Sequence, residues 1–350
     1  MSKNKQHSSF IPQKPIAQQP AITSLLDKME DGKEFESLLK YKAVNINIAG
    51  EIKKSLAEIS AIRGKPVLCY LANVVNVNIK APTSIDSNDD LPFSEMISCV
   101  PADVKEVDII IVTPGGSGQQ VARFVDKLRP RFDKVSFLLP YMAMSAGTIF
   151  VMSGDEIIMN SRAYIGPTDP QVPNKDGMYV PAQSILTLID EIKERGADLL
   201  SKGQNPPWTD LQILRQIDAK EIGNAINASK YSEELVENYL HDFKFKSWDK
   251  HSNGSIVTPE DRRTRAKEIA KMLCNHSQWK THSRGITREI AWSQCKIKTI
   301  RTEDVEGLDK AVRRFWALIY WIFENTSVFK IFTSDNYAIF RNDRSLINTK

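Results

Sequence analysis

Two short turns in this sequence carry residues that could do chemistry. The first is Thr113-Pro-Gly-Gly-Ser-Gly118, which follows an apolar, strand-like run and precedes a helical pattern. Glycines at such a turn let the backbone approach a ligand and leave N–H groups free near the positive end of a helix. The turn could hold a phosphate or an oxyanion, although it lacks both the Walker and the dinucleotide-binding spacing. A plain tight turn is the alternative interpretation.

The second turn is Tyr141-Met-Ala-Met-Ser-Ala-Gly147, again between a strand-like run and a helical pattern. Ser145 lies between the small residues Ala143 and Gly147, and small neighbours permit the sharp bend that exposes a nucleophilic serine. The N–H of Ala146 would point into the same pocket as the Ser145 hydroxyl. The alternative is that Ser145 only caps the following helix.

The two turns are more informative together than apart. They follow consecutive strands of a predicted sheet, and α/β proteins bind ligands at the carboxyl ends of their strands. One turn offers backbone donors, and the other offers a nucleophile with one more donor. The pair therefore predicts an oxyanion hole for acyl transfer.

The elements that must hold these turns form a βα pattern. Short apolar runs rich in β-branched residues cover 66–72, 107–112, 135–139 and 157–159, with helical patterns between them. Strands that are apolar throughout are buried on both faces, which is typical of a parallel sheet. The predicted fold class is therefore α/β.

The pattern changes along the chain and suggests an organisation into five parts. We expect a disordered tail, N-terminal amphipathic helices, a βα-repeat core, a helical extension that completes the fold, and a strand-like C-terminal tail, over 1–22, 23–62, 63–192, 193–324 and 325–350.

Four motifs resemble those of a known group of enzymes: Ile109-Ile-Ile-Val-Thr-Pro-Gly-Gly116, Met144-Ser-Ala-Gly-Thr-Ile149, Ser153-Gly-Asp-Glu-Ile157 and Ile165-Gly-Pro-Thr-Asp-Pro-Gln171. They resemble the crotonase-like superfamily that contains the Clp protease proteolytic subunit and signal peptide peptidase A. Within it, the sequence is most similar to the serine dehydrogenase proteinase family. The resemblance is good over 66–192 and looser over 211–324. It implies a crotonase/Clp-like core with a helical C-terminal half.

The resemblance also implies roles for individual residues. Ser145 would be the nucleophile. The oxyanion hole would be formed by the amides of Gly115, Gly116 and Ala146, and a wall of the site by Gly166, Pro167 and Asp169. Asp169 could be a functional carboxylate, or its role could be limited to forming the turn before Pro170.

Ser145 needs a base to take its proton. The window in which Clp-type enzymes carry a histidine, 164–171 here, contains none, so a triad of that chain order is not expected. Signal peptide peptidases use a lysine that burial keeps neutral. Lys230 is the favoured candidate because small residues flank it. The other candidates for the base are Lys244, Lys202 and His282.

We therefore expect a Ser-Lys type serine peptidase or hydrolase that acts on peptides or proteins through an acyl-Ser145 intermediate. One alternative is a catalytically inactive crotonase-like oligomeric scaffold. Another is an acyl-CoA hydratase, isomerase or hydrolase of the same fold, because fold alone does not choose between these chemistries.

Composition limits the partners. The net charge is +4, from 47 basic and 43 acidic residues without a clustered basic face, which disfavours nucleic acid. The 4 cysteines show no paired spacing, so neither disulfides nor a zinc site is expected, and we predict no cofactor or metal. The first residues lack an apolar segment and the apolar run 315–323 is too short to span a bilayer. We expect a cytoplasmic protein without a membrane anchor that forms homo-oligomers through its helical half.

Overall fold

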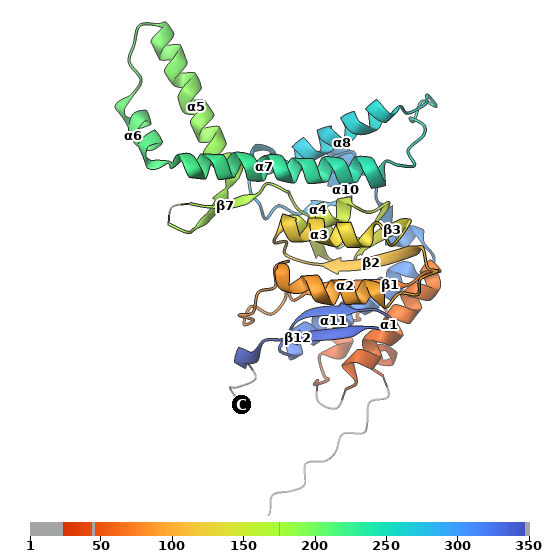
Figure 1. Ribbon diagram of the computed structural model, residues 1–350. Coiled ribbons are helices and arrows are strands. Elements are labelled where there is room, and N and C mark those ends of the chain that lie inside the picture. The colour runs from red at the N-terminus through yellow and green to blue at the C-terminus, as the bar shows by residue number, and fades with distance from the viewer. Residues whose placement is uncertain (1–23, 44–45, 175, 347–350) are drawn as a thin grey trace, which may run out of the picture.

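The fold is built on a seven-stranded sheet (Figure 1). A computed structural model describes residues 24–43, 46–174 and 176–346. The strand order is β10-β5-β3-β2-β1-β11-β12. The first five run parallel to one another, whereas β11 is antiparallel to β1 and β12 is antiparallel to β11. The α/β class and the parallel core are confirmed. The bounds are β1 Val67–Ala72, β2 Glu106–Val112, β3 Lys134–Leu139, β5 Glu156–Met159, β10 Ile300–Arg301, β11 Val328–Thr333 and β12 Ala338–Asn342.

Helices cover both faces of this sheet, which explains the apolar strands. In β1, Leu68 and Tyr70 belong to the core on one face, and Cys69 and Leu71 belong to the core on the other, as the two-residue period of a strand requires. The helices of the first face include α2 (Asp90–Ser98), α3 (Gly118–Leu128) and α4 (Ala146–Met152), and those of the second are α1 (Ile48–Arg63) and α11 (Leu308–Asn325).

The second half of the chain adds helices beyond the first face. α7 (Ala219–Tyr239) packs on α8 (Pro259–Cys274) and on α4. Figure 1 shows α5 (Ala182–Ser201) and α6 (Trp208–Gln216) projecting away from the body of the molecule. The remaining strands and α-helices are short: β4 (Met142–Ala143), β6 (Tyr164–Ile165), β7 (Gln171–Pro173), β8 (Tyr179–Pro181), α9 (His276–Trp279), β9 (Ile286–Thr287) and α10 (Arg288–Ser293). A π-helical turn, Leu240–Lys244, follows α7.

The ends of the chain differ from the sequence-based expectation. Helical spacing over 24–39 produces only two three-residue 3-10 helices, Leu26–Lys28 and Glu36–Leu38, whose leucines are buried against α1 and α11. The C-terminal segment is not a separate tail, because β11 and β12 extend the main sheet. The expected boundary at 192 falls inside α5. The expected tail over 1–22 lies outside the described residues.

Across the ranges that the structure describes, no helix is long and apolar enough to cross a membrane.

Candidate active site

The two turns singled out in the sequence lie side by side. The N–H of Thr113 donates to the carbonyl of Met142 at 3.0 Å, and the N–H of Met144 donates to the carbonyl of Thr113 at 3.1 Å. These bonds form a parallel bridge between Thr113 and Ala143. The glycine turn after β2 is therefore fixed directly against the serine turn after β3.

Ser145 occupies a strained elbow. Its backbone angles are φ 51° and ψ −118°, a region that non-glycine residues rarely adopt. The elbow is packed so closely that a Cβ on Gly115 would come within 2.7 Å of the Ser145 Cβ. Its side chain makes no capping hydrogen bond to α4, which removes the helix-cap interpretation. A strained serine at a strand-to-helix turn is the geometry of an exposed nucleophile.

The backbone around Gly116 leaves one amide available at this turn. Ile85 pairs with Gly116: its N–H donates to the Gly115 carbonyl at 2.7 Å, and its carbonyl accepts from Ser117 N–H at 2.9 Å. In such a parallel bridge the N–H of Gly116 itself points away from Ile85. The N–H of Gly115 instead donates to Thr113 Oγ1 at 3.1 Å. Of the two glycine amides expected in the oxyanion hole, that of Gly115 is therefore engaged inside the turn.

A cavity of about 680 Å³ opens over this elbow. Gly116, Ser145, Ala146 and His282 all line it. Its other walls come from Ser84, Pro114, Ser117, Gly118, Gln119, Ile149, Thr168, Pro170, Gln171, Tyr179, Ala228, Tyr231, Ser232 and Leu235. The nucleophile candidate, two backbone amides and an imidazole thus share one cavity at the carboxyl ends of the parallel strands.

Asp169 orients the imidazole of His282. This carboxylate is fully buried, and its Oδ1 lies 2.8 Å from His282 Nδ1. Its second oxygen lies 2.8 Å from Nδ1 of His276 in α9. With Nδ1 on the carboxylate, Nε2 of His282 is the nitrogen left to exchange a proton, as in a Ser-His-Asp triad. The alternative interpretation, in which Asp169 only forms the turn before Pro170, does not account for these two contacts.

The segment that carries Asp169 is held from two sides. Thr148 in α4 accepts from the Gly166 N–H at 2.9 Å, and Ser232 in α7 donates to the Thr168 carbonyl at 2.6 Å. Gly166, Pro167 and Asp169 are all buried behind Thr168 and Pro170, which line the cavity. The expected wall residues therefore support the wall rather than form its surface.

The lysine candidates for the base lie elsewhere. Lys230 is exposed on α7, although its neighbour Tyr231 lines the cavity. Lys202 is exposed and pairs with Asp198 at 2.7 Å. Lys244 lies near Glu156, which begins β5 and so lies at the amino end of the sheet, opposite to Ser145. Of the four candidates, His282 alone is among the residues that line the cavity.

Lys244 offers a prediction about stability. Burial lowers the pKa of its amine from 10.5 to about 8. Below pH 8 the amine is protonated in both the folded and the unfolded chain, and the desolvation of its charge destabilises the folded state. Between pH 8 and 10.5 the unfolded chain binds more protons than the folded chain, so the free energy of unfolding rises with pH. We expect Lys244→Met to raise the free energy of unfolding by about 1–2 kcal/mol at pH 7, because each pKa unit corresponds to about 1.4 kcal/mol and the side chain is only partly buried. Urea unfolding at pH 7 and pH 10.5 measures this. An equal gain at both values would contradict it.

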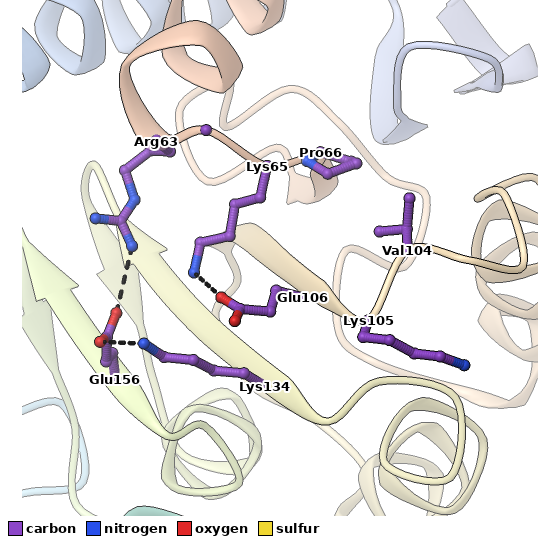
Figure 2. Close-up of a pocket in the computed structure, with 9 residues that line it drawn as sticks. Arg63, Lys65, Pro66, Val104, Lys105, Glu106, Lys134 and Glu156 are labelled. Atoms are coloured by element: carbon purple, nitrogen blue, oxygen red, sulfur yellow. Dashed lines mark hydrogen bonds and ion pairs between the residues drawn. The ribbon is translucent and has the colours of Figure 1, made fainter.

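A second hollow, of about 590 Å³, lies at the amino ends of the strands. In Figure 2, Lys65 faces Glu106, with 3.6 Å between the amine and the carboxylate, and Lys134 faces Glu156 at 2.8 Å, whereas Lys105 extends away from them. These two ion pairs already satisfy the carboxylates that line the hollow, and ligands of parallel sheets bind at the opposite edge. Within the described residues, no group of three or more His, Cys, Asp or Glu could hold a metal ion.

Two participants were missed by sequence reasoning. His276 and Ile85 contact the site through Asp169 and Gly115, respectively. Neither lies in a motif of its own, so no local signal could have found them.

Three comparisons with known proteins bear on the family of this chain. The family model described as ClpP-like SDH-type serine proteinase matches residues 53–201. The uncharacterized protein MJ0137 of Methanocaldococcus jannaschii is 32% identical over 241 residues, which cover 68% of this chain and 70% of that protein. The uncharacterized protein MJ1495 of the same organism is 30% identical over 148 residues, covering 41% and 49%. A solved mutant of the 1510-N membrane-bound stomatin-specific protease is 15% identical, covers 62% of this chain and 74% of its own, and has a TM-score of 0.35.

Proposed function

This chain belongs to the family of ClpP-like SDH-type serine proteinases, and on that basis we propose that it is a serine peptidase that works through Ser145, His282 and Asp169. The observation that carries the proposal is the shared cavity of Ser145 and His282, together with the 2.8 Å contact between His282 Nδ1 and the buried Asp169. A histidine base here replaces the lysine expected from the sequence.

In the proposed reaction, Ser145 Oγ attacks the carbonyl carbon of a peptide bond while His282 Nε2 takes the Oγ proton. The N–H groups of Gly116 and Ala146 donate to the resulting oxyanion. When the C–N bond breaks, His282 returns the proton to the leaving amine. Water, deprotonated by the same imidazole, then hydrolyses the acyl-Ser145 ester.

The direct test is labelling with a fluorophosphonate, which transfers its phosphonyl group to an activated serine with loss of fluoride. We expect intact mass to show one adduct on the wild-type protein and none on Ser145→Ala. Ser117→Ala is a matched control, because Ser117 lines the same cavity and its variant should still be labelled. A folded wild type that gains no adduct would contradict the proposal and favour an inactive scaffold. The expectations of a cytoplasmic location and of homo-oligomers stay predictions.

A further inference from the structure

A lysine lies inside the core directly behind the oxyanion turn. Lys330 is in the middle of β11 and is 1% exposed. A buried ammonium group is costly unless its charge and all its N–H groups are satisfied. A lysine at this position of an otherwise apolar strand therefore calls for an explanation beyond packing.

The ammonium group of Lys330 is fully engaged. It contacts the two carboxylate oxygens of Asp89 at 2.8 and 2.7 Å, and donates to the carbonyl of Ser84 at 2.7 Å. Asp89 is completely buried and also accepts from the Tyr70 hydroxyl at 2.8 Å. Burial raises the pKa of Tyr70, so this phenol stays a donor. The ion pair is thus tied to a particular backbone carbonyl.

That carbonyl belongs to the strand-like segment that supports the oxyanion turn. Ser84 precedes Ile85, whose N–H and carbonyl bond the turn at Gly115 and Ser117. The contact is close enough that a Cβ on Gly116 would lie 2.5 Å from the Ile85 nitrogen. Asp89 holds the other end of the segment, because its carboxylate accepts the Asp86 N–H at 3.1 Å. Any shift of 84–86 would therefore move the Gly116 amide.

A purely stabilising role explains this arrangement poorly. Buried ion pairs contribute little net stability compared with apolar side chains of similar size. What an apolar side chain cannot do is fix the direction of the Ser84 carbonyl.

We propose that Lys330, held by Asp89, is a positioning residue for the oxyanion hole: it fixes Ser84 and Ile85, which in turn place the Gly116 amide. The inference rests on the proposed function, because it concerns the same oxyanion. The effect should be confined to the transition state, in which the oxyanion forms, and should spare binding of the ground state.

The test is the hydrolysis of a short p-nitrophenyl ester by the double variant Lys330→Met, Asp89→Asn, which removes both charges of the fully buried pair together. Arg341 and Asp86, which contact Asp89 and Lys330 at 3.3 and 3.5 Å, are partly exposed and can be solvated. We expect kcat to fall about 30-fold while KM changes less than about twofold, since a misplaced donor costs less than the hundredfold or more of a deleted one. Asp108→Asn is the matched control: Asp108 is equally buried and ion-paired with Arg63, but at the far end of β2. It should keep the wild-type kcat.

Three results would overturn the inference: a wild-type kcat in the double variant, the same loss of kcat in Asp108→Asn, or a change in KM alone. If the double variant does not fold, Asp86→Ala serves instead, because it removes a partly exposed carboxylate of the same segment that lies 3.5 Å from the Lys330 amine. We expect a threefold to tenfold loss of kcat in this variant. An unchanged kcat would count against the inference. If the wild type is active and any of these results is obtained, only the role of Lys330 is refuted and the proposed function stands. A wild type that neither hydrolyses the ester nor takes up a fluorophosphonate removes the proposed function and this inference with it.

Discussion

Replacing His282 with alanine is expected to slow fluorophosphonate labelling of Ser145 by about a thousandfold, within the range that loss of a general base causes. Among the described residues that line the cavity, the other titratable side chains are those of Tyr179 and Tyr231. Without the imidazole, no basic side chain of this lining remains to take the Oγ proton. The measurement is the second-order rate of adduct formation, followed by intact mass at pH 7.5. Circular dichroism and thermal unfolding check that the variant is folded.

Lys230→Met is the matched comparison for this experiment. Lys230 is exposed on α7 and does not line the cavity, so its variant should be labelled at a rate within about twofold of the wild type. The opposite pattern, in which Lys230→Met loses labelling and His282→Ala keeps it, would restore the Ser-Lys dyad expected from the sequence. A similar loss in both variants would mean that neither residue alone is the base.

The strands and the two turns could be predicted because their signals are local. The apolar run that forms β2 and the small residues around Ser145 are neighbours in the chain, and both follow from backbone and burial rules. The glycine pair at 115–116 is also recognisable in the chain, although the contacts that require these glycines come from Ser145 and Ile85, about 30 residues away on either side. Local signals therefore sufficed to single out the proposed nucleophile.

The proposed base could not be found in this way, because its position depends on contacts between distant parts of the chain. His282 follows α8 and α9, and the end of α8 is brought to the site where the carbonyl of Leu273 accepts the Thr168 N–H at 2.9 Å. No pattern in the sequence reports that bond. The hydrogen bond from the Lys330 amine to the Ser84 carbonyl is equally non-local, since β11 comes from the far end of the chain and pairs with β1.

One pattern in the sequence bears on the direction of the Lys230 side chain. The inward face of α7 includes Ala225, Ser232, Leu235 and Tyr239, which recur at spacings of three, four and seven residues. Lys230 does not belong to that repeat, and the helix turns its side chain toward solvent. The small residues that flank Lys230 predicted that this part of the helix lies close to the Ser145 elbow, but they did not predict the direction of the Lys230 side chain.

The second large effect is expected at Asp169. Changing it to asparagine should slow labelling of Ser145 by about a thousandfold to ten-thousandfold, as in other Ser-His-Asp sites. The amide group can donate to Nδ1 of His282, which stabilises the tautomer whose Nε2 carries a proton and cannot accept one from Ser145. The same second-order rate of adduct formation measures the loss.

His276→Ala separates this role from a structural one. His276 contacts the other oxygen of Asp169 at the same 2.8 Å, so its removal disturbs the carboxylate but leaves the bond to His282 in place. We expect a loss of about tenfold or less in this variant. Equal losses in Asp169→Asn and His276→Ala would show that Asp169 mainly anchors the segment 276–282. A much larger loss in Asp169→Asn, with both proteins folded, requires that the carboxylate set the tautomer of the base.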